Sequence, residues 1–189
     1  INYFIEGGVD DIVIIRGNHV NFLRGVLKKY GVELSIGYEL HTRDYSILIT
    51  HGHLDLDPYS YDLVVIGHEH PSMRCLGHYK TPVLMKIPFK NIEDKYIVVL
   101  PAIGPYHPGT QVTLDSSMYL SPIIRKYGDL SNAKILLWFK LSSDNYVDEL
   151  PYLDRESEVY TLTFFKELNV LIIEFNRLSE ALDICSSLT

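Results

Sequence analysis

Histidines stand directly after short apolar runs at three places in the first seventy residues of the chain. The three turns read Gly-Asn-His at 17–19, His-Gly-His at 51–53 and Gly-His-Glu-His at 67–70. Together they hold five of the chain's eight histidines. Imidazole nitrogens and amide oxygens are ligands that divalent first-row metals accept in proteins. A scatter of core histidines would not repeat this arrangement, so the spacing predicts a metal site.

The apolar runs before these turns must bring the histidines together. Residues 12–15, 47–49 and 63–66 are short and rich in β-branched side chains, which is typical of strands buried on both faces of a sheet. Strands that end at the same edge of such a sheet place their following loops around one crevice. A His-x-His pair in extended backbone sends both side chains to the same face. The glycines of the three turns are expected to let the backbone come close and adopt left-handed angles.

Periodicity and turn residues predict the other elements. Apolar side chains at 22–30 have helical spacing, with Asn21 as the cap and Gly31 as the stop. Residues 104–122 are rich in Gly, Pro, Ser and Thr and predict a long loop of the kind that is often functional. Strands are expected at 37–40, 45–49, 72–77, 83–89, 96–100 and 133–140, with 72–77 and 83–89 as an antiparallel pair.

The composition is that of one globular unit followed by a segment of different texture. The chain has 189 residues, of which 47% are hydrophobic and 22% charged, as in soluble globular proteins. We divide it into a core at 1–141 and an appendage at 142–189, whose apolar strips suggest an interaction element or a homodimer contact. Within the appendage, 159–165 and 170–175 are compatible with strands or with one irregular helical unit, and 178–188 predicts a helix.

Charge and cysteine content narrow the partners and the compartment. The net charge of −7 argues against nucleic acid, because phosphate contacts need a basic surface. One basic stretch, from Arg74 to Lys95, is either a solvated hairpin or a phosphate-contacting rim. No apolar run approaches the roughly 20 residues that cross a bilayer, and no secretory signal opens the chain, so a cytoplasmic location is expected. Cys75 and Cys185 are too few and too far apart for a disulfide framework, and are expected to be buried thiols.

The three histidine turns, in this order and each after an apolar strand, resemble those of the calcineurin-like metallophosphoesterase family over roughly residues 10–105. The stretch from Leu100-Pro101-Ala102 to Leu120-Ser121-Pro122 is similar to that of an archaeal subgroup related to the nucleases SbcD and Mre11. The resemblance implies a four-layer α/β/β/α sandwich. It also implies hydrolysis of a phosphodiester or phosphomonoester at two divalent ions, which clamp the phosphoryl group while a metal-bound hydroxide attacks. Manganese is the expected metal, and zinc, iron or nickel would suit the same ligands.

The same resemblance assigns roles to the turn residues. Asn18, His51 and His68 would bind the second metal, and His70 would bind the first. His19 would be catalytic instead of a ligand: it would protonate the leaving oxygen or stabilise charge on the phosphoryl group, as an imidazole can near neutral pH.

Three neighbouring residues have more than one reading. His53 would contact the substrate or the first metal, or would instead contact and orient a side chain that binds the metal. Arg16 would pair with phosphate or form a salt bridge at a strand end. Glu69 stands between two expected ligands and so faces the other way, either at the surface or behind the ligands. The remaining histidines, His41, His78 and His107, belong to no motif and are expected to be structural or exposed.

The upstream part of the family's pattern is absent from this sequence. The family has Asp-x-His and Gly-Asp motifs before Gly-Asn-His, and this chain has no Asp-x-His. Because the sequence also lacks an initiator methionine, we expect that the N-terminal strands of the fold are missing from it; the alternative is a relative that has lost part of its site. Val20 replaces a usual acidic residue, a change that would lower activity without removing a ligand. The chain alone is then expected to hold at most one metal tightly, through Asn18, His51 and His68.

Two functions of different classes follow from these observations. The first is a metal-dependent phosphoesterase. The acidic net charge favours a small phosphoester as its substrate, whereas the resemblance to nucleases favours DNA ends. The second is a catalytically silent interaction or scaffold domain that keeps the fold and a partial metal site.

Overall fold

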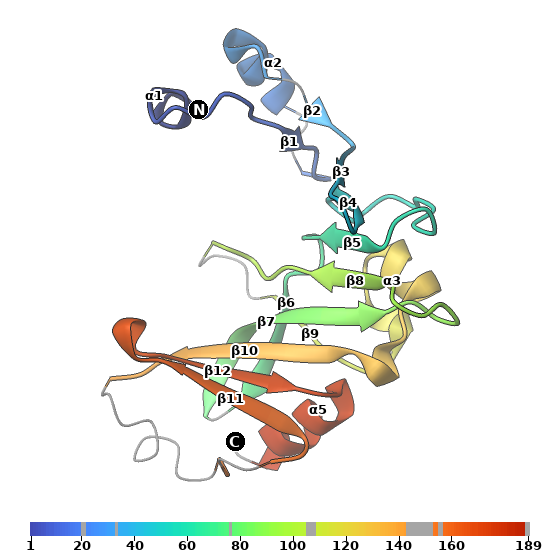
Figure 1. The fold of residues 1–189 in the computed structure, drawn as a ribbon, viewed down its shortest axis with the longest axis vertical. Coiled ribbons are helices and arrows are strands. Elements are labelled where there is room, and N and C mark those ends of the chain that lie inside the picture. Colours follow the sequence, from blue (N-terminus) through green and yellow to red (C-terminus); the bar gives the residue numbers. More distant parts are fainter. Residues whose placement is uncertain are drawn as a thin grey trace.

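A large β-sheet with a few helices around it dominates the computed structural model of the protein (Figure 1). The structure describes residues 1–19, 22–32, 34–75, 77–104, 109–142, 153–154 and 157–187, with only the backbone described at 78 and 79. The predicted α/β class is confirmed at this level. No helix in the described part of the chain is long and apolar enough to cross a membrane.

Ten strands form the large sheet, and eight of them follow the path β11-β12-β10-β7-β8-β5-β4-β3. The strands β6 and β9 lie off this path, where β6 pairs antiparallel with β7 and parallel with β9. The predicted antiparallel pair is therefore present as β6 and β7. The bounds of the ten strands are β3 (Gly37–His41), β4 (Ser46–Thr50), β5 (Leu63–Ile66), β6 (Pro71–Cys75), β7 (His78–Pro88), β8 (Tyr96–Val99), β9 (Thr110–Gln111), β10 (Lys134–Lys140), β11 (Tyr160–Phe165) and β12 (Val170–Phe175).

The strands β4, β5 and β8 run parallel to one another, which decides where their following loops meet. Leu63 pairs with Ile47 on one side and with Tyr96 on the other. Because the three strands point the same way and are in register, their carboxyl ends share one edge of the sheet. Burial alternates along β5, where Val64 and Ile66 are fully buried and their neighbours half-buried. The prediction that these strands are buried on both faces is therefore wrong, since one face carries the core.

The C-terminal segment joins the same sheet. β12 pairs antiparallel with β10 on one side and β11 on the other, so the two late apolar runs are strands and not a helical unit. The predicted C-terminal helix is confirmed as α5 (Leu178–Ser187), which buries Leu178, Ala181 and Cys185 and contacts β10 and β12. The sheet thus continues through the segment after residue 142 that composition separates from the core.

The stretch predicted as a long loop contains short elements that lead into a helix. Its described part holds β9 and the 3-10 turn η2 (Ser116–Met118), while residues 105–108 lie outside the described ranges. Ser121 then precedes α3 (Pro122–Tyr127), whose first residue is a proline, as helices tolerate at this position. Two further 3-10 turns are η3 (Leu130–Asn132) and η4 (Lys166–Leu168).

The two cysteines form a disulfide, which corrects the prediction of free buried thiols. Cys75 at the end of β6 is bonded to Cys185 in α5, across 110 positions of sequence. Both side chains are 1% exposed, so the expectation of burial holds. Sequence distance misled the prediction because α5 turns back over the sheet and lies against β6.

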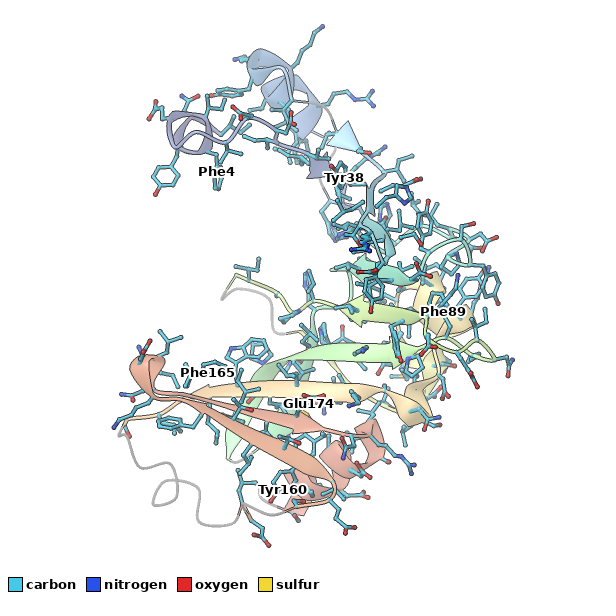
Figure 2. The ribbon with its side chains drawn as sticks, viewed as in Figure 1. Phe4, Tyr38, Phe89, Tyr160, Phe165 and Glu174 are labelled. Carbon is cyan, nitrogen blue, oxygen red and sulfur yellow. A yellow bond between two sulfur atoms is a disulfide. The ribbon has the colours of Figure 1, made fainter. Side chains whose placement is uncertain are left out.

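The N-terminal elements form an arm at one end of the molecule (Figure 1). The arm contains α1 (Asn2–Glu6), β1 (Ile14–Ile15), α2 (Leu23–Leu27), η1 (Lys28–Tyr30) and β2 (Leu34–Ser35). Its β1 pairs parallel with β2 in a separate two-stranded sheet, so the expectation that the run at 12–15 forms a buried strand of the main sheet is wrong. Leu27 is the one buried residue among the described residues of 1–36, and Phe4 is 55% exposed (Figure 2).

Helix α2 follows its predicted limits closely. It begins at Leu23, continues as η1 and stops at Gly31, whose φ of 69° is the left-handed conformation that ends helices. Asn21, the predicted cap, lies outside the described residues.

Candidate metal centre

Three turns that follow strands converge on one pocket, as the sequence predicts. The turn after β4 carries His51 and His53, the turn after β5 carries His68 and His70, and Asn18 follows β1 of the arm. The pocket has a volume of about 280 Å³. Its lining residues are Asn18, His19, His51, His68, Glu69, His70, Gly109, Thr110 and Leu120.

His51 Nε2 lies at the centre of this arrangement. Asn18 Oδ1 is 3.0 Å from it, and His68 Nδ1 is 3.1 Å from it. A ring nitrogen of a neutral imidazole either carries a proton and donates, or carries a lone pair and accepts. His51 Nε2 therefore has the same role, donor or acceptor, toward both neighbours. Asn18 Oδ1 and His68 Nδ1, from two other turns, therefore both lie within about 3 Å of His51 Nε2.

These separations fit the ligand sphere of a divalent ion. Ligand atoms about 2.1 Å from an ion and roughly at right angles lie about 3 Å apart, which is close to the two observed distances. Among the described residues, however, no group of three or more His, Cys, Asp or Glu side chains is arranged to hold a metal ion. The set that converges has only two such side chains, His51 and His68, and takes its third donor from the Asn18 amide. It fits one ion with an incomplete protein sphere.

The surroundings keep the central imidazoles neutral. Burial, followed by the nearby His68 and other ring neighbours, lowers the pKa of His51 from 6.5 to about 4. Burial also lowers the pKa of His68, with smaller contributions from His53, His70 and His19. At neutral pH both rings therefore offer lone pairs, which is the state that binds metals.

Asn18 connects the central pair to His19. Its Oδ1 faces His51, while its Nδ2 lies 3.2 Å from His19 Nε2. Because the amide nitrogen only donates, His19 Nε2 accepts in this contact. The Asn18 amide thus contacts both His19, the expected catalytic residue, and His51, an expected metal ligand.

His53 stands beside the central pair with an unsatisfied ring nitrogen. Its ring centroid is 5.1 Å from that of His51 and 6.0 Å from that of His68. Its Nδ1 is buried without a hydrogen-bond partner in the described part of the chain. Burial, and then the charge of Arg16, lowers the pKa of His53.

His70 adopts an unusual backbone conformation that a neighbouring loop supports. Its φ is 47°, a left-handed value that is uncommon for a residue with a side chain. The N–H of Thr110 donates to the His70 carbonyl at 3.0 Å. Gly109, with φ of 72°, comes so close that an added Cβ would lie 2.6 Å from that carbonyl oxygen. The glycine permits the approach that keeps His70 at the pocket.

Glu69 and Ser121 are the residues that sequence reasoning did not define. Glu69 is almost fully buried, where the sequence left surface and interior open. Burial raises the pKa of its carboxyl, and the N–H groups of Ser121 and Leu120 together with Arg125 act in the opposite direction. Neither His-x-His pair lies in extended backbone, because Gly52 has φ 99° and His70 has φ 47°, so that expectation from the sequence is wrong. No local signal in the sequence points to Ser121 as the partner of Glu69.

Other predicted features are less closely tied to the pocket. Of the glycines at 17, 52 and 67, only Gly52 has a positive φ, at 99°, so the expectation of left-handed angles is wrong for the other two. His41 lies at the end of β3, 3.7 Å from Glu39, and both side chains are exposed. His107 and the side chain of His78 lie outside the described residues.

Comparisons with known proteins give little. No protein-family model and no curated protein matches the chain. One solved structure, from work on "a Novel Archaeal Phosphodiesterase", matches with 19% identity and a TM-score of 0.30. The match covers 50% of this chain and 55% of that chain, so this chain spans about half of that protein's length.

Proposed function

We propose that this chain carries one metal-binding half of a phosphoesterase centre, in which Asn18, His51 and His68 hold a single divalent ion. The approach of Asn18 Oδ1 and His68 Nδ1 to His51 Nε2, at 3.0 and 3.1 Å, carries this proposal. Manganese is the ion that the family resemblance implies, and an amide oxygen with two neutral imidazoles also suits zinc, iron or nickel. When bound, such an ion polarises a phosphoryl oxygen and makes water a stronger nucleophile.

The residues around the ligands would bind the anion and handle a proton. His19 lines the pocket beside Asn18, and its imidazole is proposed to protonate the leaving oxygen or to stabilise charge on the phosphoryl group. Arg16 acts electrostatically on His53 and would pair with a phosphate oxygen entering from that side. The orphaned His53 Nδ1 would then have a polar partner from substrate or from a further ion.

A small phosphoester is the substrate class that we favour over DNA ends. The net charge is −7, and a pocket of about 280 Å³ suits a phosphoryl group with a small substituent. Two lysines of the basic stretch from Arg74 to Lys95 are engaged locally, which supports its reading as a hairpin. Lys86 lies 4.0 Å from the centre of the Tyr96 ring, and Lys95 donates to the Tyr59 carbonyl at 2.6 Å.

The second metal, with His70 as a ligand, needs carboxylates that the described residues do not bring to the pocket. Glu69 is the one carboxylate among the lining residues, and it accepts a hydrogen bond from the Ser121 backbone N–H. This observation favours a second candidate function, a binding domain that holds one ion without turnover. The four-layer sandwich, the cytoplasmic location and the homodimer through 142–189 also stay predictions.

Metal content and turnover test the proposal together. After treatment with a chelator and titration with Mn²⁺, we expect one ion per chain by calorimetry and elemental analysis. Hydrolysis of bis-p-nitrophenyl phosphate by the wild-type protein should then depend on Mn²⁺. A wild-type protein that binds no Mn²⁺ would overturn the proposal, and binding without turnover would select the second candidate. DNA as substrate would instead be revealed by binding that weakens steeply with added salt.

A further inference from the structure

Two buried polar side chains, Glu69 and Ser121, join the two turns that carry the histidine pairs. Glu69 is 1% exposed and Ser121 is 0% exposed. The Glu69 carboxylate accepts a hydrogen bond from the Ser121 N–H, and the Ser121 hydroxyl donates to the Gly52 carbonyl at 2.7 Å. Glu69 lies between His68 and His70 in sequence, and Gly52 lies inside the other turn. Ser121 therefore holds both turns at once.

The Ser121 side chain does not cap helix α3, although Ser121 stands at the position where a serine usually does so. It is the residue before α3, with an extended backbone at φ −70° and ψ 121°. Serine at this position usually bonds an N–H of its own helix, which stabilises a helix by about 1 kcal/mol. Here its side chain makes no such bond, and the hydroxyl goes to Gly52, 69 positions away. Helix stability is therefore not what this hydroxyl serves.

Glu69 is also a costly choice for stability alone. Its Oε2 is buried without a hydrogen-bond partner among the described residues. A buried polar atom left unpaired costs about 1–3 kcal/mol, whereas an apolar side chain of similar size would fill the space without that cost. What the carboxylate contributes is the hydrogen bond that its Oε1 accepts from the Ser121 N–H, together with its electrostatic interactions with the Leu120 N–H and Arg125.

We infer that Glu69 and Ser121 are positioning residues of the proposed metal centre. Their two hydrogen bonds fix the turn at 51–53 against the turn at 67–70, so that His51 Nε2 and His68 Nδ1 stay at 3.1 Å. They act through the two imidazoles and are assigned no contact with ion or substrate. Ligands must be held to within about 0.5 Å to be effective, and a link between the two turns helps to hold them. The expected effect on metal binding rests on the proposed function, whereas the effect on the positions of the two imidazoles does not.

Four variants separate positioning from general stability. Ser121→Ala removes the bond to Gly52, and Glu69→Ala removes the bond to Ser121. Glu69→Gln keeps an oxygen that accepts from the Ser121 N–H, while it removes the charge and replaces the other carboxylate oxygen with an amide NH2 group. The matched control is Ser46→Ala, which deletes a hydroxyl that donates to Asp62 at 2.7 Å at the opposite end of β4.

Two measurements are made on each variant. The first is the spectrum of the His51 and His68 imidazoles by nuclear magnetic resonance in metal-free protein, which reports their mutual position. The second is the Mn²⁺ affinity by calorimetry. Ser121→Ala and Glu69→Ala should shift the imidazole signals and weaken Mn²⁺ binding by about tenfold or more. Glu69→Gln and Ser46→Ala should retain the wild-type values of both.

The outcomes distinguish the inference from the proposed function. Unchanged imidazole signals in Ser121→Ala and Glu69→Ala would overturn the inference, as would equal effects in Ser46→Ala. A tenfold loss of affinity in Glu69→Gln with unchanged signals would assign Glu69 an electrostatic role and also overturn it. If the wild-type protein binds no Mn²⁺, the proposed function fails, while the metal-free spectra still decide the positioning role. If Glu69→Ala does not fold, Ser121→Ala decides.

Discussion

His51 shows how a residue's chemistry depends on its surroundings more than on its type. An exposed imidazole has a pKa near 6.5, whereas burial and four neighbouring imidazoles lower that of His51 to about 4. Sequence spacing predicts that these rings come close, and they do. It does not predict which ring lies at the centre, because that depends on how the arm brings Asn18 to the pocket.

The low pKa of His51 makes stability depend on pH in metal-free protein. Between about pH 6.5 and 4 the unfolded chain binds a proton at His51 that the folded chain does not, so the free energy of unfolding falls as the pH falls through this window. Above pH 6.5 both states are neutral and the contribution is constant. Urea unfolding at pH 7.5, 6.0 and 5.0 with a chelator measures it. The difference in stability between wild type and His51→Gln should shrink toward pH 5; a constant difference would contradict the pKa.

Removing a central imidazole should abolish tight metal binding. We expect His68→Ala to weaken Mn²⁺ binding at least about a hundredfold, because losing even a partner of a ligand costs 10- to 100-fold. His41→Ala is the control, since His41 is exposed on β3 and lines no part of the pocket. Calorimetric titration of both variants gives the comparison, and equal affinities would exclude His68 as a ligand.

At the scale of elements, the parallel strands were predictable and the partners of their turns were not. The runs before His51 and His68 predict β4 and β5 because apolar side chains are dense there, and the following turns leave from one edge. Ser121 could not be predicted as their link. The bond from Ser121 to Gly52 spans 69 positions and depends on where α3 lies on the sheet, which no local pattern encodes. The isolation of β1 was equally hidden, since its composition matches that of a core strand.

The turn after β4 depends on Gly52 having no side chain. Its φ is 99°, and an added Cβ would lie 2.9 Å from the Cβ of Ile66. We expect Gly52→Ala to lower the free energy of unfolding by about 2 kcal/mol or more, from the left-handed backbone and the contact together. Gly25→Ala is the matched control: Gly25 lies in α2 with nothing within 4 Å, so alanine should stabilise by about 0.5–1 kcal/mol. Thermal and urea unfolding compare the two, and a neutral Gly52→Ala would contradict the geometry.

At the scale of the whole molecule, one covalent link closes most of the main sheet's sequence into a ring. The disulfide joins Cys75 and Cys185 across 110 positions, which include β7, β8 and the C-terminal strands. Closing a loop of that length restricts the unfolded chain strongly. The link therefore stabilises elements that it does not touch.

Reducing this disulfide should destabilise the fold. We expect the free energy of unfolding to fall by about 2–4 kcal/mol on reduction, since the unfolded chain regains the freedom that the ring removes. Urea unfolding with and without dithiothreitol measures the change. The double variant Cys75→Ala and Cys185→Ala should be less stable than oxidised wild type and should not respond to the reductant. A wild-type protein indifferent to dithiothreitol would contradict the link.

Asn18 follows β1 of the small sheet, whereas His51 and His68 follow strands of the large one. An ion that binds all three side chains would therefore connect the arm to the large sheet. Any freedom that the arm loses on binding would lower the affinity for that ion. Metal binding and the order of the arm would then be coupled. Saturation with Mn²⁺ should therefore slow amide hydrogen exchange across residues 1–36.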